Sequence, residues 1–114
     1  MPSGNVRKRE KAMPETKPVS TRSADGAVVD AIMITETDNV ATCLHDIESG
    51  AQVTVMLGRD TRHVSAADPI PRGHKLAVRD IAEGESVMKY GEIIGKASAN
   101  ICAGNHVHTH NVVD

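Results

Sequence analysis

The chain is 114 residues long, which fits a single domain, and it contains neither Phe nor Trp and only one Tyr. Its net charge of −2 is uneven, because residues 1–26 hold six Lys or Arg against three acids, whereas residues 27–114 hold seven against twelve. An acidic body without an aromatic platform argues against nucleic-acid binding, and no apolar run is long enough for a membrane span or a signal peptide.

The first 26 residues hold three of the five prolines and almost no large apolar side chain. Such a segment cannot bury enough surface to offset the entropy lost on ordering. We therefore predict a disordered basic extension over residues 1–26 and one folded domain over residues 27–114. The basic charge leaves open a contact of the extension with nucleic acid or with an acidic partner.

A strand is predicted first in the folded part, at "AVVDAIMI" (27–34). A short helix is expected next, within "TDNVATCLHDI". There Val40, Leu44 and Ile47 recur at helical spacing, and Asp38 is a suitable N-cap.

A hairpin is predicted after this helix. "AQVTVML" alternates apolar and polar residues, and a "GRD" turn leads into a second short strand around Val64. Val, Ile and Leu together number 22 in residues 27–114, enough for one small core and hardly for two. Most of them are β-branched, which favours strands.

An internal repeat, Ile-x-x-Gly-x-x-Val/Leu, is the strongest pattern in the chain. It predicts one tight turn used four times, in which Ile anchors in the core, Gly takes a positive φ, and Val or Leu begins the next strand. The irregular spacing excludes a solenoid and favours a compact β structure with many turns. The four copies are "DIESGAQV" (46–53), "PIPRGHKL" (69–76), "DIAEGESV" (80–87) and "NICAGNHV" (100–107).

Three blocks of this region resemble a known family in their order and spacing: Gly73-His74-Lys75, Lys89-Tyr90-Gly91 and His106-Val107-His108. Residues 35–111 closely resemble the N-terminal domain of altronate dehydratases and are similar to the small subunit of sulfolactate sulfo-lyases. Galactarate dehydratases share the pattern except for the "HVHTHN" ending.

The resemblance implies a mainly β, SAF-type β-clip of short strands and tight turns, to which the local pattern above adds one short helix. It also implies an iron-dependent lyase acting on sugar acids. The large second part of the fused dehydratases is absent from this sequence, so we expect either a separate large subunit or a fragment. The basic extension is not part of the family pattern.

The stretch "NHVHTHN" (105–111) offers candidate metal ligands. In a strand, His106, His108 and His110 share a face, with neighbours about 6.5–7 Å apart and the outer two about 13 Å apart. At most one adjacent pair can then reach one ion, and we assign His106 and His108. Spacing alone does not name the metal, and an exposed strand of hydrogen-bonding histidines is the alternative.

Further ligands would have to come from elsewhere. His74, His63, Cys43, Cys102 and a carboxylate of a partner chain are the possible sources. Cys43 and Cys102 form no CxxC motif, which fits a cytoplasmic protein with reduced thiols, and a disulfide between them stays open.

His74 and Lys75 follow Gly73 and would point to opposite faces of a strand. Following the resemblance we assign both to substrate binding, with Lys75 as a point charge for a carboxylate; a surface lysine is the alternative. Tyr90 is expected to fill the core with its hydroxyl at the rim. Catalysis by Cys102 with His106 is poorly supported, and the catalytic residues stay unknown.

We therefore expect the small subunit, or N-terminal domain, of an altronate-type dehydratase that removes water from a hexonate together with a large chain. A divalent metal, iron by resemblance, belongs to the complete enzyme, whose base and most metal ligands we expect on the large chain. A homo-oligomer is possible. The alternatives are the small subunit of a sulfolactate sulfo-lyase and a non-catalytic SAF module that binds sugar or protein.

Overall fold

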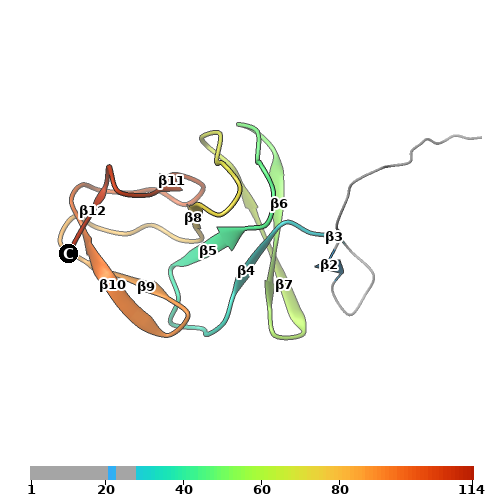
Figure 1. The fold of residues 1–114 in the computed structure, drawn as a ribbon, viewed down its shortest axis with the longest axis horizontal. Helices are drawn as coiled ribbons and strands as arrows, with labels where there is room; N and C mark the ends of the chain where they lie inside the picture. The colour runs from blue at the N-terminus through green and yellow to red at the C-terminus, as the bar shows by residue number, and fades with distance from the viewer. Residues whose placement is uncertain (1–20, 23–27) are drawn as a thin grey trace, which may run out of the picture.

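The computed structural model describes residues 21–22 and 28–114, and the described part is built from short β-strands (Figure 1). The predicted mainly β class is confirmed. No helix occurs in these residues, and accordingly none of them forms a helix suited to crossing a membrane. The strands are β2 (Thr21–Arg22), β3 (Val28–Val29), β4 (Ala31–Met33), β5 (Val40–Cys43), β6 (Gln52–Leu57), β7 (Asp60–Ser65), β8 (Lys75–Ala77), β9 (Ser86–Lys89), β10 (Glu92–Ala97), β11 (His106–Val107) and β12 (Val112–Val113).

The strands form three sheets. A six-stranded sheet has the order β11-β8-β5-β4-β6-β7, a three-stranded sheet has the order β12-β10-β9, and β2 pairs with β3. All pairs are antiparallel except β4 with β6. The three-stranded sheet lies at one end of the molecule and the β6–β7 hairpin lies across the middle strands from it.

The four predicted turns are confirmed. Gly50, Gly73, Gly84 and Gly104 have φ values of 88°, 85°, 86° and 94°, a region that glycine adopts readily and other residues resist. In each turn the residue after the glycine donates its N–H to the carbonyl three residues earlier, at 2.9–3.0 Å. Each glycine N–H donates to the backbone carbonyl of a small buried residue, which is Ala66, Cys43, Ala97 and Ala77, respectively.

The isoleucines join these turns in two pairs. Ile47 and Ile70 exchange two backbone hydrogen bonds of 2.8 and 2.9 Å, and Ile81 and Ile101 exchange two of 2.8 Å. All four side chains are buried. The domain therefore has an Ile47–Ile70 half (46–53 with 69–76) and an Ile81–Ile101 half (80–87 with 100–107).

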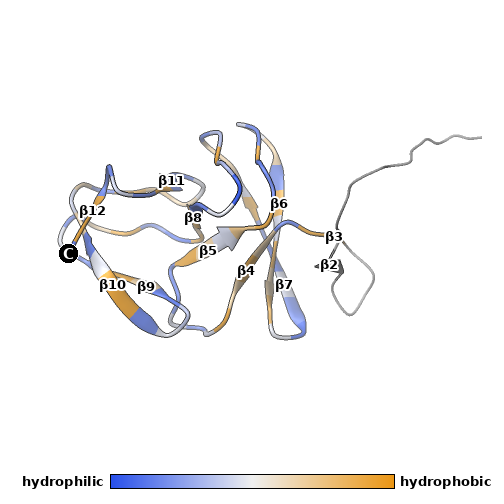
Figure 2. Cartoon of the chain, viewed as in Figure 1, coloured by the Kyte–Doolittle hydropathy of each residue, from blue (hydrophilic) through white to orange (hydrophobic). Residues whose placement is uncertain are grey.

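Two apolar clusters, rather than the single core expected from the aliphatic count, hold these halves together. The paired strands β5 and β8 lie between the clusters, because adjacent residues of a strand point to opposite faces. Ala41 and Leu76 belong to the first cluster, and Val40 and Ala77 to the second. Apolar residues recur along these central strands (Figure 2).

The predicted helix at 38–47 is wrong. Val40–Cys43 is strand β5, which pairs antiparallel with both β4 and β8. The helical spacing misled because Val40 packs in one cluster and Ile47 in the other, so the two residues do not share a face.

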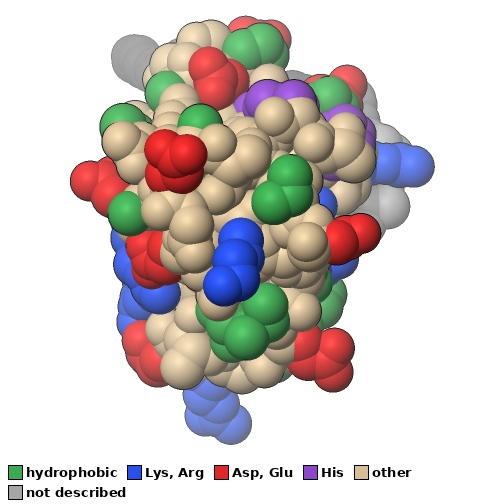
Figure 3. Space-filling model, turned by 90° about the vertical axis from the view of Figure 1, so that its left-hand side faces the viewer, with side chains coloured by type: hydrophobic (Ala, Val, Ile, Leu, Met, Phe, Trp, Pro, Cys, Tyr) green, Lys and Arg blue, Asp and Glu red, His purple; other side chains and the backbone are tan. Residues whose placement is uncertain are grey.

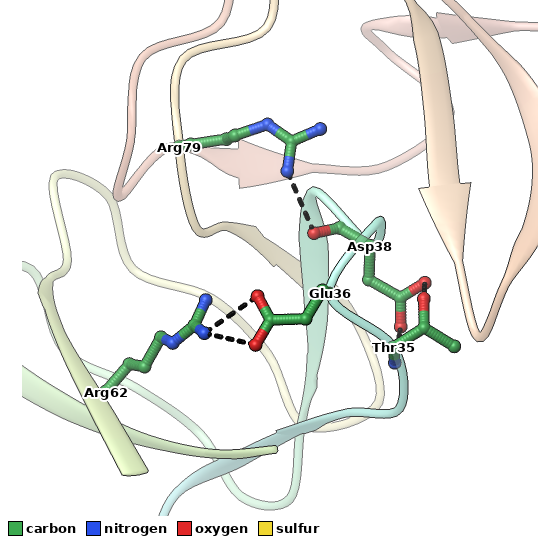
Figure 4. A network of polar contacts seen from close by, with 5 residues as sticks. All are labelled: Thr35, Glu36, Asp38, Arg62 and Arg79. Atoms are coloured by element: carbon green, nitrogen blue, oxygen red, sulfur yellow. Dashed lines mark hydrogen bonds and ion pairs between the residues drawn. The ribbon is translucent and has the colours of Figure 1, made fainter. Parts of the chain in front are cut away.

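Asp38 caps a loop instead of a helix. Its carboxylate accepts the N–H groups of Ile34 at 2.9 Å, Thr35 at 3.1 Å and Gly91 at 2.7 Å. Burial raises the pKa of this carboxyl, but the hydrogen bonds outweigh burial, and the net pKa is lowered. The Thr35 hydroxyl also donates to this carboxylate, and Arg79 donates to the Asp38 carbonyl at 3.3 Å (Figure 4).

Asn39, fully buried beside Asp38, joins β5 to the three-stranded sheet. Its Nδ2 donates to the Ser86 carbonyl at 2.9 Å, and its Oδ1 accepts the Met88 N–H at 2.7 Å. The Asn39 N–H also donates to the Met88 carbonyl at 3.1 Å. Strand β5 and the three-stranded sheet are therefore coupled by a buried amide as well as by packing.

The other predictions from local pattern can be placed as follows. The hairpin is confirmed as β6 and β7, and the strand predicted at 27–34 is observed as β3 and β4, separated at Asp30. The disorder predicted for residues 1–26 lies outside the described residues, except that Thr21–Arg22 pairs with Val28–Val29.

Candidate functional site

The pairing of β8 with β11 positions the candidate histidines. His106 pairs with Leu76, and Val107 pairs with Lys75. Paired residues of an antiparallel ladder share a face, so His106 lies on the face of Leu76. His74, two residues before Leu76, lies on this face too.

The imidazoles of four residues gather here, and we call His74, His106, His108 and His110 the histidine cluster. His74 Nδ1 and His106 Nε2 are 2.9 Å apart, within hydrogen-bond distance. The His74 ring stacks on that of His108 with 3.7 Å between centroids, whereas the His106 and His108 centroids are 5.9 Å apart. The structure thus brings the predicted residues His106 and His108 together around His74.

The strand predicted through His110 is wrong. Strand β11 ends at Val107, and a turn follows, held by Asn111. The His108 N–H donates to Asn111 Oδ1 at 3.0 Å, and Asn111 Nδ2 donates to the His106 carbonyl at 2.9 Å. This turn folds His110 back to 5.0 Å from His106 between ring centroids, far closer than an extended strand allows.

His106 and His108 favour the neutral imidazole, because the pKa of each is lowered. Burial lowers the pKa of His106, and the neighbouring His110, His74 and His108 lower it further, against an opposing effect of Asp68. Burial, followed by His74, Lys75 and His110, likewise lowers the pKa of His108. Neutral imidazoles are the form that binds metals and accepts protons.

Asp68 fixes the backbone at the cluster. Its Oδ2 accepts the His106 N–H at 2.9 Å and the Asn105 side-chain amide at 3.1 Å. His108 Nδ1, in contrast, is buried without a hydrogen-bond partner in the structure. A buried unsatisfied nitrogen is costly, and it marks the place in the cluster where a ligand or partner group would be stabilised.

Lys75 lies on the face of Val107 and Thr42, opposite to that of His74 and His106. It is half-buried, and burial lowers its pKa, as does the nearby positive charge of Lys89. The buried Thr42 hydroxyl opposite Lys75 has no hydrogen-bond partner. Lys75 is thus a desolvated cation adjoining the cluster from a second face.

An open groove of about 600 Å³ adjoins His106. It is lined by the paired Ile47 and Ile70 and by their neighbours in the first two copies of the repeat, namely Asp46, Glu48, Ser49, Pro69 and Pro71. Sequence reasoning missed the groove, although its lining comes from copies of the repeat.

The residues present do not by themselves fit a metal. Within residues 28–114, no three His, Cys, Asp or Glu side chains are arranged to hold one ion. The His74 and His108 rings stack at an interplanar angle of 11° instead of converging on a point. Cys43 is buried in the core, where burial and the Asp30 charge raise the pKa of its thiol to about 12.

The remaining candidates take other positions. His63 lies exposed on β7, and Cys102 lies exposed beside the Ile81–Ile101 bridge. Tyr90, expected to fill the core, is instead 43% exposed. Figure 3 shows histidine side chains at the surface together, near one edge of the view onto the three-stranded sheet.

Comparison with known proteins identifies the domain. The altronate/galactarate dehydratase SAF domain matches residues 29–114. The chain belongs to this family. The SAF domain therefore comprises both isoleucine bridges, the histidine cluster and the groove.

The similar proteins include two dehydratases and a lyase subunit. Altronate dehydratase of Escherichia coli K12 is 48% identical over 80 residues, which cover 70% of this chain and 15% of that protein. Galactarate dehydratase (L-threo-forming) of the same organism is 32% identical over 84 residues, again 15% of its length. The (2R)-sulfolactate sulfo-lyase subunit alpha of Chromohalobacter salexigens is 47% identical over 68 residues, 58% of this chain and 72% of that subunit.

Proposed function

We propose that this SAF domain is the small subunit, or N-terminal domain, of an altronate-type sugar-acid dehydratase that works with a large chain in the cytoplasm. The observation that carries the proposal is the histidine cluster at the edge of an open groove. The 48% identity with altronate dehydratase supports this substrate class.

Dehydration of a hexonate across C2–C3 needs three functions: a base for the proton α to the carboxylate, stabilisation of the enediolate, and an acid for the departing hydroxide. The pKa values of His106 and His108 are both lowered, which favours the neutral imidazole. A neutral imidazole can accept a proton or donate a hydrogen bond. Lys75 is the candidate to pair with the substrate carboxylate, as a point charge on the second face.

Within the described residues, the histidine cluster alone does not provide all three of these functions. A divalent metal, iron by family resemblance, is proposed for the complete enzyme, with most of its ligands on the large chain. The large chain would therefore provide most of the active site, and the SAF domain would close it with His74, His106 and His108.

A second candidate is the small subunit of a sulfolactate sulfo-lyase. One observation favours it: the matched segment spans 72% of a protein that is itself called a subunit, but only 15% of each dehydratase. The leaving group would then be sulfite instead of hydroxide, with the same enediolate chemistry.

The test is reconstitution of the chain with the purified large dehydratase chain of its source organism. Turnover of altronate and release of sulfite from sulfolactate are measured with wild type, His106→Ala and His108→Ala. We expect each variant to lose about 100-fold in rate or more, whereas the exposed His63→Ala, a matched control, stays near wild type. Full activity in both cluster variants contradicts the proposal, and a complex that converts neither substrate favours a non-catalytic binding module.

A further inference from the structure

The only tyrosine of the chain occupies an unusual position. Tyr90 lies at the turn between β9 and β10 with φ of 55°, and among residues 28–114 it is the one non-glycine residue with a positive φ. Tyr90 and Gly91, with φ of 55° and 81°, form the two-residue loop of the β9–β10 hairpin, and such loops favour positive φ at both positions. Asn is the usual residue at the first of them, so an exposed tyrosine there points to a function outside the folding of the hairpin.

Three other large apolar side chains are exposed, two on the three-stranded sheet and one on the loop after β4. Ile34, Ile93 and Val113 are 56%, 64% and 52% exposed, and with Tyr90 they are the exposed large hydrophobic residues of the described part. Ile93 and Val113 belong to β10 and β12 of the three-stranded sheet. In Figure 3, which looks onto this end of the molecule, hydrophobic side chains lie on both sides of a basic one.

Asp38 holds two parts of this surface in fixed positions. Its buried carboxylate binds the N–H of Ile34 and the N–H of Gly91, next to Tyr90. The loop after β4 and the β9–β10 turn are thereby joined. A preorganised apolar surface loses little entropy on binding, as binding hot spots require.

Two lysines adjoin the apolar side chains of this surface. Lys89 Nζ lies 5.1 Å from the centroid of the Tyr90 ring, and Lys96 pairs with Val113 across β10 and β12. Glu92 lies opposite Lys89, and Asp114 follows Val113. The two lysines lie beside Tyr90 and Val113, so a protein whose apolar patch is bordered by carboxylates fits this part of the surface.

We propose that Tyr90, Ile93, Val113 and Ile34 form the surface on which the large lyase chain docks, with Lys89 and Lys96 pairing with its carboxylates. This inference rests on the proposed function for the identity of the partner. It is supported by altronate dehydratase, in which the matched domain is 15% of the protein and most of the chain lies outside it. The docking surface is distinct from the histidine cluster, which lies on β8 and β11.

The test measures affinity of the chain for the purified large chain of the source organism by biolayer interferometry. Tyr90→Asn removes the ring while supplying a residue that tolerates positive φ, and Ile93→Asp places a charge at the most exposed apolar position. We expect each to weaken binding by about tenfold or more. Arg59→Gln, at the turn of the β6–β7 hairpin, is the control and keeps wild-type affinity.

A measurement of stability separates docking from folding. Tyr90→Asn should keep or raise the melting temperature while affinity falls, a combination that a purely structural role of the ring would not produce. Affinity should also fall as salt increases, because the lysine contacts are screened. Wild-type affinity in both Tyr90→Asn and Ile93→Asp overturns the proposal, as does a homodimer in sedimentation that these variants dissociate.

Failure of docking and failure of the proposed function give different results. His106→Ala should lose turnover while losing less affinity than Tyr90→Asn or Ile93→Asp, since the cluster is proposed to complete the active site and not the docking surface. An active complex whose affinity ignores Tyr90 and Ile93 overturns the docking surface alone. A complex that depends on both residues but converts no sugar acid supports the surface and overturns the dehydratase function.

Discussion

The two halves of the domain share a backbone and differ in chemistry. In the Ile47–Ile70 half, Asp46 Oδ1 accepts the Arg72 N–H at 2.9 Å, and in the Ile81–Ile101 half Asp80 Oδ1 accepts the Ala103 N–H at the same distance. Each isoleucine bridge lines a groove, of about 600 Å³ in the first half and about 320 Å³ in the second.

The difference lies in side chains that the shared backbone does not use. In the second half, Asn100 Oδ1 accepts the Glu83 N–H at 2.8 Å. In the first half, Pro69 occupies the equivalent position of the repeat. His106 borders the larger groove and exposed Cys102 borders the smaller one. One repeated turn is thus used in both halves. The candidate site forms where the turns 69–76 and 100–107, one from each half, bring histidines to the paired strands β8 and β11.

Gly104→Ala should cause the largest loss of stability, because the turn at Gly104, unlike the turn at Gly84, leaves no room for a Cβ. A Cβ at Gly104 would collide with the Ser65 carbonyl oxygen, whereas a Cβ at Gly84 meets nothing within 4 Å. We expect a loss of about 3–5 kcal/mol for Gly104→Ala, from strain plus overpacking, and about 1 kcal/mol for Gly84→Ala. Urea unfolding of both variants measures this, and equal losses would contradict the structural difference.

Asn39→Ala should uncouple β5 from the three-stranded sheet. The substitution removes the bonds to Ser86 and Met88 and leaves the Met88 N–H without its side-chain acceptor. A loss of about 2–4 kcal/mol is expected in urea unfolding. Hydrogen exchange should accelerate more in β9 and β10 than in β6 and β7; uniform acceleration would show that Asn39 does not specifically join β5 to the three-stranded sheet.

Acid should weaken the same junction through Asp38. Its pKa is lowered from 3.8 in the folded state, so the stability it contributes is complete above about pH 5 and lost as the pH falls through the folded-state pKa. The difference in unfolding free energy between wild type and Asp38→Asn should be constant above pH 5 and shrink below pH 4. The exposed Glu36→Gln is the control, and a difference independent of pH would exclude this role of Asp38.

The smallest effects are expected at the cysteines. Cys43 receives the glycine N–H of its turn as Ala66, Ala77 and Ala97 do in theirs, so Cys43→Ala should cost about 1 kcal/mol. Cys102→Ala, at an exposed position, should stay within about 0.5 kcal/mol of wild type. A loss of several kcal/mol for Cys43→Ala would show that its environment differs from the other three.

Local signals in the sequence predicted the parts of the fold that are locally determined. The positive φ of Gly50 and Gly84 follows from the turn itself, and the β6–β7 hairpin follows from alternation around Gly58. The helix expected at Val40–Ile47 failed because helical spacing cannot distinguish one face of a helix from two cores on opposite sides of a strand.

The candidate site could be predicted only in part. The histidines were identified by residue type and resemblance, but the His74–His106 contact depends on β8 pairing with β11, residues distant in sequence. The return of His110 depends on Asn111, whose side chain closes the turn. The exposure of Tyr90 contradicts the expectation for a lone aromatic residue, and this reversal carries the docking proposal.

The different burial of the two thiols makes the domain suitable for site-specific spectroscopy. With its pKa raised to about 12, Cys43 carries almost no thiolate near neutral pH and is shielded from reagents. A maleimide dye or spin label should therefore modify Cys102 alone, without any engineered cysteine. Such a label, at the smaller groove, would report distances to a partner chain while leaving the histidine cluster unmodified.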